Sequence, residues 1–269
     1  MGFRPKDPTL EDFLVRIETL CEKDDMETAR KELTRALKRF PDDLALREWE
    51  AVFAAEEERF EEALAFLDSV LKAEPHRPFA VRERASVLME MGRFAEAVDA
   101  LRTYLEADLA EGDAQEEAEA RYDLAASLDH LGRVAEADAE FLKAARLAPD
   151  DFPVPPRMTR AEFEDLVAKA LDSIPSRFEP YLRQVAVTVE DYPSRDEPGP
   201  FILGLYDGVP RTERTHDEEG HLDRVFIYKR NHELLNLPRE EVLEEVRKTV
   251  IHEIAHHFGL GEEDMGEYA

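Results

Sequence analysis

The first half of the chain carries a helical pattern of apolar and small residues that repeats every 34 residues. Alanines recur at one position of this period: Ala29, Ala63, Ala97 and, after an insertion of six residues, Ala137. Pro41 and Pro75 repeat at the same spacing and mark the ends of two units. A unit of this length is typical of a helix pair that buries its apolar face only against neighbouring units. We expect four pairs, at residues 10–43, 44–77, 78–111 and 118–151, with an acidic loop at 107–117.

The last of these units shows the pattern most clearly. Small residues stand where paired helices would touch, and a glycine stands at the turn between them: Leu124, Ala125, Leu128, Gly132, Val134, Ala137, Phe141, Ala144 and Pro149. These residues resemble the tetratricopeptide repeat. The resemblance implies an array with a concave surface that binds a peptide or a protein segment. A spacer or a dimerisation surface is the alternative interpretation.

The helical pattern stops at a proline-rich stretch, residues 150–156, where we place the domain boundary, giving domains 1–151 and 152–269. Beyond it, Thr159 is suited to cap a helix that ends before Pro175. Three stretches with the residue types of strands follow: 185–189, 201–206 and 224–229. A long polar loop, 207–223, separates the last two. The expected fold class is therefore an α-helical array followed by a small α+β domain.

A final amphipathic helix is predicted from Pro238 to Gly259. Apolar residues recur every four positions along it: Val242, Val246, Val250, Ile254 and Phe258. Proline suits the first turn of a helix, and glycine suits the residue that ends one. The sequence His252-Glu253-Ile254-Ala255-His256 therefore lies in the last two turns.

This sequence indicates a metal site. Residues four apart share one face of a helix, so His252 and His256 can offer their imidazoles to one ion. Glu253 lies beside them, where it can act on a metal-bound water as general base. A catalytic zinc needs three protein ligands and one open position. A chain that turns back at Gly259 brings Glu262 towards the ion.

Other third ligands stay open at this point. Glu263 and Asp264 are near neighbours of Glu262 that could replace it, whereas the upstream His216, His221 and His232 have no spacing argument. Tyr206 is a candidate donor to a developing oxyanion, and His216 is a candidate substrate contact. A strand tyrosine more often serves packing.

The second half also resembles a known family. Gly204-Leu205-Tyr206-Asp207-Gly208-Val209-Pro210, then Thr212-Glu213-Arg214, then the segment 252–259 are similar to the bacterial minimal zincin-like metallopeptidases. The resemblance covers Thr159 to Met265 and implies one Zn²⁺ ion, a catalytic Glu253 and a peptide or protein substrate. The family usually has Asp where this chain has Glu262.

Composition and charge limit the classes of function and the cellular compartment that we expect. The 269 residues carry a net charge of −28, which repels phosphate backbones and argues against nucleic-acid binding. No apolar run is long enough to span a membrane, the N-terminus lacks a signal-peptide core, and Cys21 is the single cysteine. We therefore expect a cytoplasmic zinc-dependent peptidase whose repeats bind a substrate or partner. One alternative is a metal-stabilised interaction module without catalytic activity. Another is a hydrolase that uses the same site to cleave bonds other than peptide bonds.

Overall fold

The structure is a computed structural model that describes residues 7–107, 110, 112–174, 176, 185–194, 199–208 and 223–257, without the side chains of His256 and His257. The chain divides into two compact units, Met1–Glu140 and Phe141–Ala269. The division falls within a helix, and the boundary expected at 151/152 stays a prediction. Each unit is described by itself.

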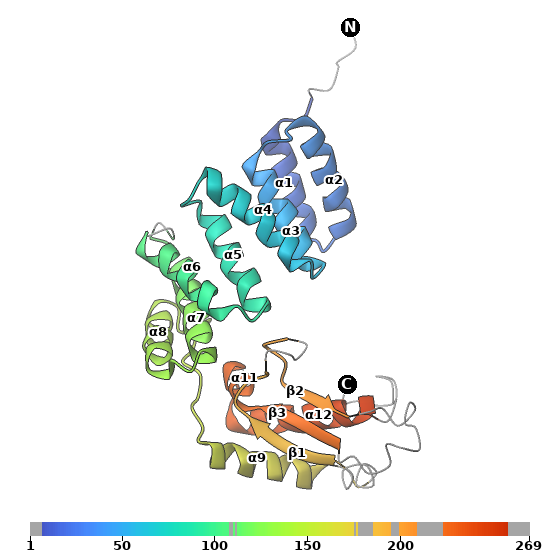
Figure 1. Ribbon diagram of the computed structural model, residues 1–269, viewed down its shortest axis with the longest axis vertical. Coiled ribbons are helices and arrows are strands. Elements are labelled where there is room, and N and C mark those ends of the chain that lie inside the picture. Colours follow the sequence, from blue (N-terminus) through green and yellow to red (C-terminus); the bar gives the residue numbers. More distant parts are fainter. Residues whose placement is uncertain are drawn as a thin grey trace. The chain divides into compact units, whose positions relative to one another are not determined.

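The first unit is built from helices that follow one another in pairs (Figure 1). Their bounds are α1 Leu10–Cys21, α2 Met26–Arg39, α3 Leu44–Glu56, α4 Phe60–Ala73, α5 Pro78–Glu90, α6 Phe94–Glu106 and α7 Ala114–His130, with α8 Val134–Leu147 shared between the units. From α1 to α7 each helix packs against the next. The four expected pairs are confirmed. The end of the expected acidic loop is helical instead, because Asp113 caps α7 by accepting from the N–H groups of Gln115 and Glu116.

All four pairs turn in the same way between their two helices. The turn residues are Asp24, Glu58, Gly92 and Gly132, with φ between 57° and 73°. In each turn, the N–H of the following residue donates to a carbonyl five residues back, as Arg59 does to Ala54 and Arg93 does to Leu88. The glycine pattern predicted this turn in the third and fourth units only, since the first two adopt it with residues that bear a Cβ.

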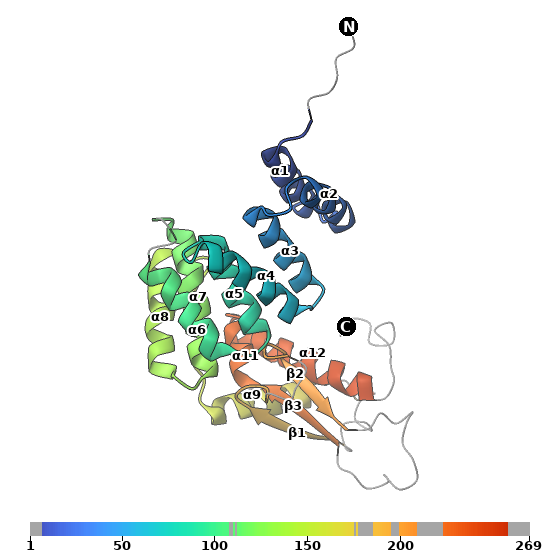
Figure 2. The ribbon, with the colours of Figure 1, turned by 45° about the horizontal axis from the view of Figure 1, so that its top comes forward.

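The second unit places a three-stranded sheet against two helices (Figure 2). Its elements are α9 Arg160–Ser173, β1 Val185–Glu190, β2 Gly204–Asp207, β3 Asp223–Tyr228, α11 Lys229–Leu234 and α12 Arg239–His257. The strand order is β1-β3-β2, with β1 parallel and β2 antiparallel to β3. Helices α9 and α12 pack against each other, and α12 also packs against β2 and β3. The expected α+β class is confirmed.

The core of this unit lies between α9, α12 and one face of the sheet. Its fully buried side chains include Phe163 and Leu166 of α9 and alternate residues of β3, Val225 and Ile227. The apolar residues predicted to recur every four positions on α12 are buried where the structure describes them: Val242, Val246, Val250 and Ile254. Thr159 caps α9 with a reciprocal bond to Glu162, as expected for that helix start.

The strand boundaries differ from the expectation by one to three residues, except at the start of β1. Strand β2 begins at Gly204, because residues 201–203 form a turn and not the start of a strand. Strand β3 ends at Tyr228, and the next residue, Lys229, begins the short helix α11. Helix α11 was not predicted from the sequence. The spacing of Lys229 and Glu233, four apart and of opposite charge, is the helical signal it contains.

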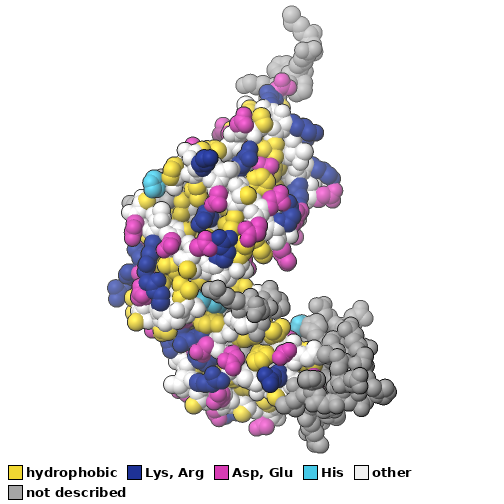
Figure 3. Space-filling view, viewed as in Figure 1, with side chains coloured by type: hydrophobic (Ala, Val, Ile, Leu, Met, Phe, Trp, Pro, Cys, Tyr) yellow, Lys and Arg dark blue, Asp and Glu magenta, His cyan; other side chains and the backbone are white. Residues whose placement is uncertain are grey.

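None of the described helices combines the length and apolarity that crossing a membrane requires. On the face of the repeat unit seen in Figure 3, acidic and basic side chains are interspersed.

Candidate functional site

The motif residues lie at the end of α12, beside its buried stripe. Ile251 and Ile254 are 1% exposed and face the core, whereas His252 and Glu253 are half-buried. The backbone at His256 is helical, so it lies one turn beyond His252 on the same face. The helix expected for the motif is therefore present. Outside the described residues lie the expected third ligand Glu262, its alternatives Glu263 and Asp264, and the candidates His216 and His221.

Glu253 is held by the edge of the sheet. Its Oε2 accepts a hydrogen bond from the backbone N–H of Tyr206 in β2, with a donor–acceptor distance of 2.9 Å. The carboxylate thus connects the motif helix to the strand of the Gly204–Pro210 segment. Sequence reasoning selected both segments but did not predict their contact, which joins residues 47 apart.

The outer side of β2 is not paired with another strand among the described residues. The N–H of Tyr228 donates to the carbonyl of Leu203, so alternate residues Leu203, Leu205 and Asp207 direct their backbone groups towards β3. Gly204 and Tyr206 therefore direct theirs away from β3. Among the described strands, β2 pairs with β3 alone, which makes it an edge.

Gly204 allows the helix to approach this strand closely. A Cβ added at Gly204 would lie 2.5 Å from Cγ2 of Thr249 and 3.3 Å from Cγ of Glu253, both on α12. Real side chains do not make contacts as short as the first, so only glycine fits here without a shift. The position opposite Gly204 on β3 is the buried Ile227, which shows that Gly204 faces the core side of the sheet.

The Tyr206 side chain also lies on the core side, since its partner across the ladder is the buried Val225. The ring is partly buried and packs against the core of the unit. Its hydroxyl lies close to Gly208, where an added Cβ would overlap it. The ring therefore packs against the core, while the oxyanion role of the hydroxyl stays a prediction.

Helix α11 fixes the segment that leads into β2. The Asn231 side-chain amide donates to two carbonyls, that of Pro200 at 2.9 Å and that of Ile202 at 2.7 Å. Asn231 is 3% exposed. Because one buried amide binds both carbonyls, it holds the chain in a defined path before Gly204. This positioning residue was not found from the sequence.

The same helix contains a buried ionic cluster. Glu233, fully buried, accepts from Lys229 Nζ at 2.9 Å, from Arg230 at 2.9 Å and from the backbone N–H of Met158 at 2.8 Å. Arg157 lies 3.6 Å from its second oxygen. The cluster ties the chain before α9 to the helix after β3.

His232, one of the upstream histidines, lies in the interior of the second unit. It is fully buried, its ring lies against Phe163, and its Nδ1 is 2.9 Å from the carbonyl oxygen of Tyr228. A carbonyl only accepts, so Nδ1 carries the hydrogen. Burial lowers the pKa of His232 to about 4, which keeps the imidazole neutral near pH 7.

The donor types at the end of α12 suit zinc, which binds imidazole nitrogen and carboxylate oxygen. Among the side chains that the structure describes, no group of three or more His, Cys, Asp or Glu lies close enough to hold a metal ion. The expected set includes His256 and Glu262, whose side chains are outside that description.

Family comparisons match both halves of the chain. Residues 182–269 match the model of the zincin-like metallopeptidases. Three tetratricopeptide repeat models match residues 20–78, 50–117 and 118–151. The layout expected from the sequence is thus confirmed.

Solved structures similar to this chain include several MamA proteins. MamA from Desulfovibrio magneticus RS-1 is 19% identical, with a TM-score of 0.45 over 52% of this chain and 76% of that one. MamA AMB-1 is 21% identical, with a TM-score of 0.43 over 54% and 83%. A search of curated proteins found no match. The family matches thus place tetratricopeptide repeats in residues 20–151 and a zincin-like domain in residues 182–269.

Proposed function

We propose that the C-terminal domain is a zinc-dependent peptidase and that the repeats bind its substrate or a partner protein. The observation that carries the proposal is the bond from the Tyr206 N–H to Glu253, because it positions the proposed general base at the edge of the described sheet. His252 and His256 would hold the ion, with Glu262 as the third ligand. When bound, zinc would polarise the scissile carbonyl and lower the pKa of a water towards ~7.

Glu253 performs the proton transfers in this proposal. The N–H of Tyr206 binds its Oε2 and orients the carboxylate, which is expected to accept a proton from the attacking water. The carboxyl group then donates that proton to the leaving amine. A hydrogen bond from a fixed backbone N–H keeps the carboxylate in one orientation through both steps, which favours catalysis by a positioned base.

The substrate class follows from the edge strand. The N–H and carbonyl of Gly204 and the carbonyl of Tyr206 face away from β3. An extended peptide can pair with such groups as an added strand. The Tyr206 N–H binds Glu253, so substrate pairing at this edge would use the backbone groups of Gly204.

The test uses the full chain loaded with zinc and a library of unstructured peptides. The Glu253→Gln variant should keep its zinc content and lose turnover by about 10²–10⁴-fold, the usual range for removing a general base. Glu245→Gln is the matched control on the same helix, because Glu245 is paired with Lys248 and lies two turns earlier. Equal turnover by wild type and Glu253→Gln would contradict the proposed role.

A metal-stabilised interaction module without catalysis is the second candidate. The repeat matches over residues 20–151 favour it, since such arrays serve binding and need no chemistry from the second domain. Zinc at one equivalent in wild type, with no turnover of any library peptide, is the outcome that this candidate predicts.

A further inference from the structure

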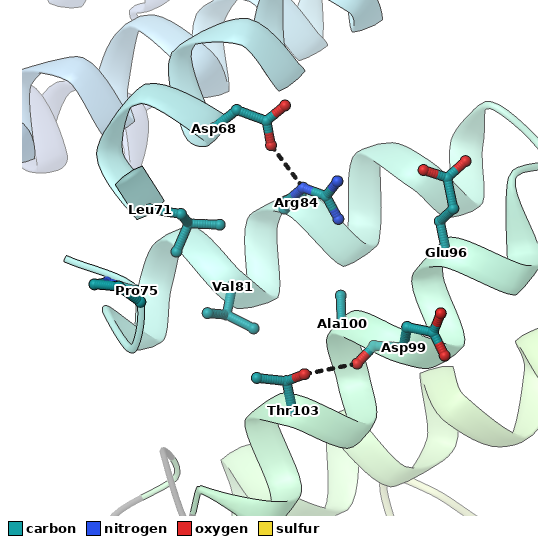
Figure 4. A pocket seen from close by; sticks show the side chains of 9 residues that line it. All are labelled: Asp68, Leu71, Pro75, Val81, Arg84, Glu96, Asp99, Ala100 and Thr103. Atoms are coloured by element: carbon teal, nitrogen blue, oxygen red, sulfur yellow. Dashed lines mark hydrogen bonds and ion pairs between the residues drawn. The ribbon is translucent and has the colours of Figure 1, made fainter. Parts of the chain in front are cut away.

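A groove of about 410 Å³ lies on the repeat unit, between helices α4, α5 and α6 (Figure 4). Its apolar part is formed by one side chain from each helix: Leu71 of α4, Val81 of α5 and Ala100 of α6. Val81 and Ala100 are 4% and 9% exposed, so they belong to the packed interior and present a fixed surface. Figure 4 shows the three side chains directed towards the same space.

Acidic side chains surround this apolar surface. Asp68, Glu96 and Asp99 line the groove together with a single cation, Arg84. Arg84 is already bound, because its Nε donates to Asp68 at 2.8 Å. Glu96 accepts two hydrogen bonds from Arg93, at 2.7 and 2.8 Å, and these lower its pKa and keep it charged.

Asp99 differs from the other two acids. Within the part of the chain that the structure describes, its exposed carboxylate forms neither a hydrogen bond nor an ion pair, although its backbone carbonyl accepts from Thr103. Glu136 and, more weakly, Asp99 raise the pKa of Arg133, whose hydrogen bonds go to Glu136. The groove therefore offers an apolar surface next to an exposed anion that is not hydrogen-bonded to that cation. The whole chain, at −28, also attracts basic molecules.

We infer that this groove binds a short segment of another protein in which aliphatic and basic side chains are neighbours. The aliphatic side chain would cover the half-buried Leu71 and the small exposed parts of Val81 and Ala100, and would so remove apolar surface from water. A lysine or arginine beside it can lay its stem along the same surface and bring its charge to Asp99. An acidic segment is excluded by repulsion, since three carboxylates and one committed cation line the groove.

The inference rests on the binding role proposed for the repeats but does not need peptidase activity, because every lining residue lies on α4 to α6 or in the turn between α4 and α5. It is tested by binding and not by turnover. The probe is a fluorescein-labelled peptide of alternating leucine and lysine, measured by fluorescence anisotropy with the full chain at physiological ionic strength. Two matched peptides replace either every leucine by serine or every lysine by glutamate.

We expect the leucine–lysine peptide to bind and both matched peptides to bind at least tenfold more weakly. Asp99→Lys should weaken binding of the leucine–lysine peptide by about tenfold, since it replaces an attraction by a repulsion of similar size. Thr103→Trp, at an exposed position of the lining, should weaken it by filling the groove. Asp99→Asn keeps the shape of the side chain and should weaken binding of the leucine–lysine peptide by about threefold. This variant replaces Asp99→Lys in the test if Asp99→Lys does not fold.

Glu106→Lys is the control, because it makes the same charge change on the same helix outside the lining. It should alter binding less than twofold. Equal weakening by Glu106→Lys and Asp99→Lys would show general attraction to an acidic protein and overturn the inference. Equal binding of the serine–lysine peptide, tighter binding of the leucine–glutamate peptide, or no binding of any peptide would also overturn it.

Discussion

The backbone N–H of Tyr206 donates to Oε2 of Glu253 at 2.9 Å, which joins the edge strand of the sheet to the motif helix. This contact depends on residues outside the motif as well as on the strand and the helix that carry Tyr206 and Glu253. Asn231 fixes the chain before β2, and Gly204 lets α12 approach the strand. The orientation of Glu253 thus depends on a strand, a short helix and a glycine that lie well outside the motif.

Gly204→Ala is expected to disturb this arrangement. The new Cβ would be 2.5 Å from Cγ2 of Thr249, and relieving such an overlap costs about 1–3 kcal/mol. Unfolding of the C-terminal unit should become easier by that amount, as measured by hydrogen exchange in α12. Turnover, where present, should fall with it, because the strand that holds Glu253 moves.

A second substitution makes this prediction specific. Thr249→Ser removes Cγ2 but keeps the hydroxyl that donates to the Glu245 carbonyl. The double variant should recover about 1 kcal/mol relative to the sum of the two single changes. Gly199→Ala is the tolerated control, because its nearest neighbour would be 3.9 Å away. Strict additivity of Gly204→Ala and Thr249→Ser would show that the overlap does not decide the effect.

Glu233→Gln should be strongly destabilising. The change removes one charge and leaves the buried Lys229, 3% exposed, with the more distant and exposed carboxylate of Asp191 at 3.8 Å. Breaking a buried ion pair in this way costs about 3–5 kcal/mol. Glu244→Gln is the control on α12, since Glu244 is 44% exposed in its pair with Arg247 and should cost less than ~1 kcal/mol. Urea unfolding followed by hydrogen exchange compares the two, and similar costs would contradict the role of Glu233.

Most of the secondary structure followed from local pattern. The alanine period found the four helix pairs, and the stripe from Val242 to Ile254 found α12, because both patterns report burial along a regular helix. Helix α11 was missed since its buried residues are polar: Lys229, Asn231, His232 and Glu233. Such residues are normally exposed, and only their partners in distant segments make burial favourable.

The candidate site was likewise predicted only in part from the sequence. His252, Glu253 and His256 are visible as a motif because their relation is set by helix geometry within a few residues. The bond from Tyr206 to Glu253 and the amide of Asn231 connect segments 29 to 47 residues apart. Spacing along the chain contains no signal for such contacts, which depend on sheet order and strand register.

His232 should make the C-terminal unit less stable as the pH falls. Its pKa is about 4 in the folded chain and about 6.5 in an unfolded one, so the unfolded state binds the proton first. Stability is fully present above pH ~6.5 and is lost between there and pH ~4, by at most about 3 kcal/mol.

The measurement compares wild type with His232→Asn, whose amide can still donate to the Tyr228 carbonyl. Protection of α9 and α11 against hydrogen exchange, corrected for the intrinsic rate, should fall less between pH 7 and 5 in the variant. The repeat helices should show the same dependence in both proteins. An unchanged slope in α9 and α11 would assign the acid sensitivity to other groups.

Glu58→Gly should stabilise the repeat unit. Glu58 occupies the turn of the second pair at φ 57°, the conformation that glycine occupies at φ 66° in the third pair. A left-handed residue with a Cβ costs about 1–2 kcal/mol, and the greater freedom of glycine in the unfolded chain offsets about half of this. The expected gain is therefore about 0.5–1 kcal/mol, which thermal unfolding followed by Trp49 fluorescence can measure.

Gly92→Ala is the mirror control, because an added Cβ meets no atom within 4 Å there and any loss of stability comes from backbone conformation alone. Lower stability of Glu58→Gly than of the wild type would contradict the cost assigned to the backbone angle at this turn.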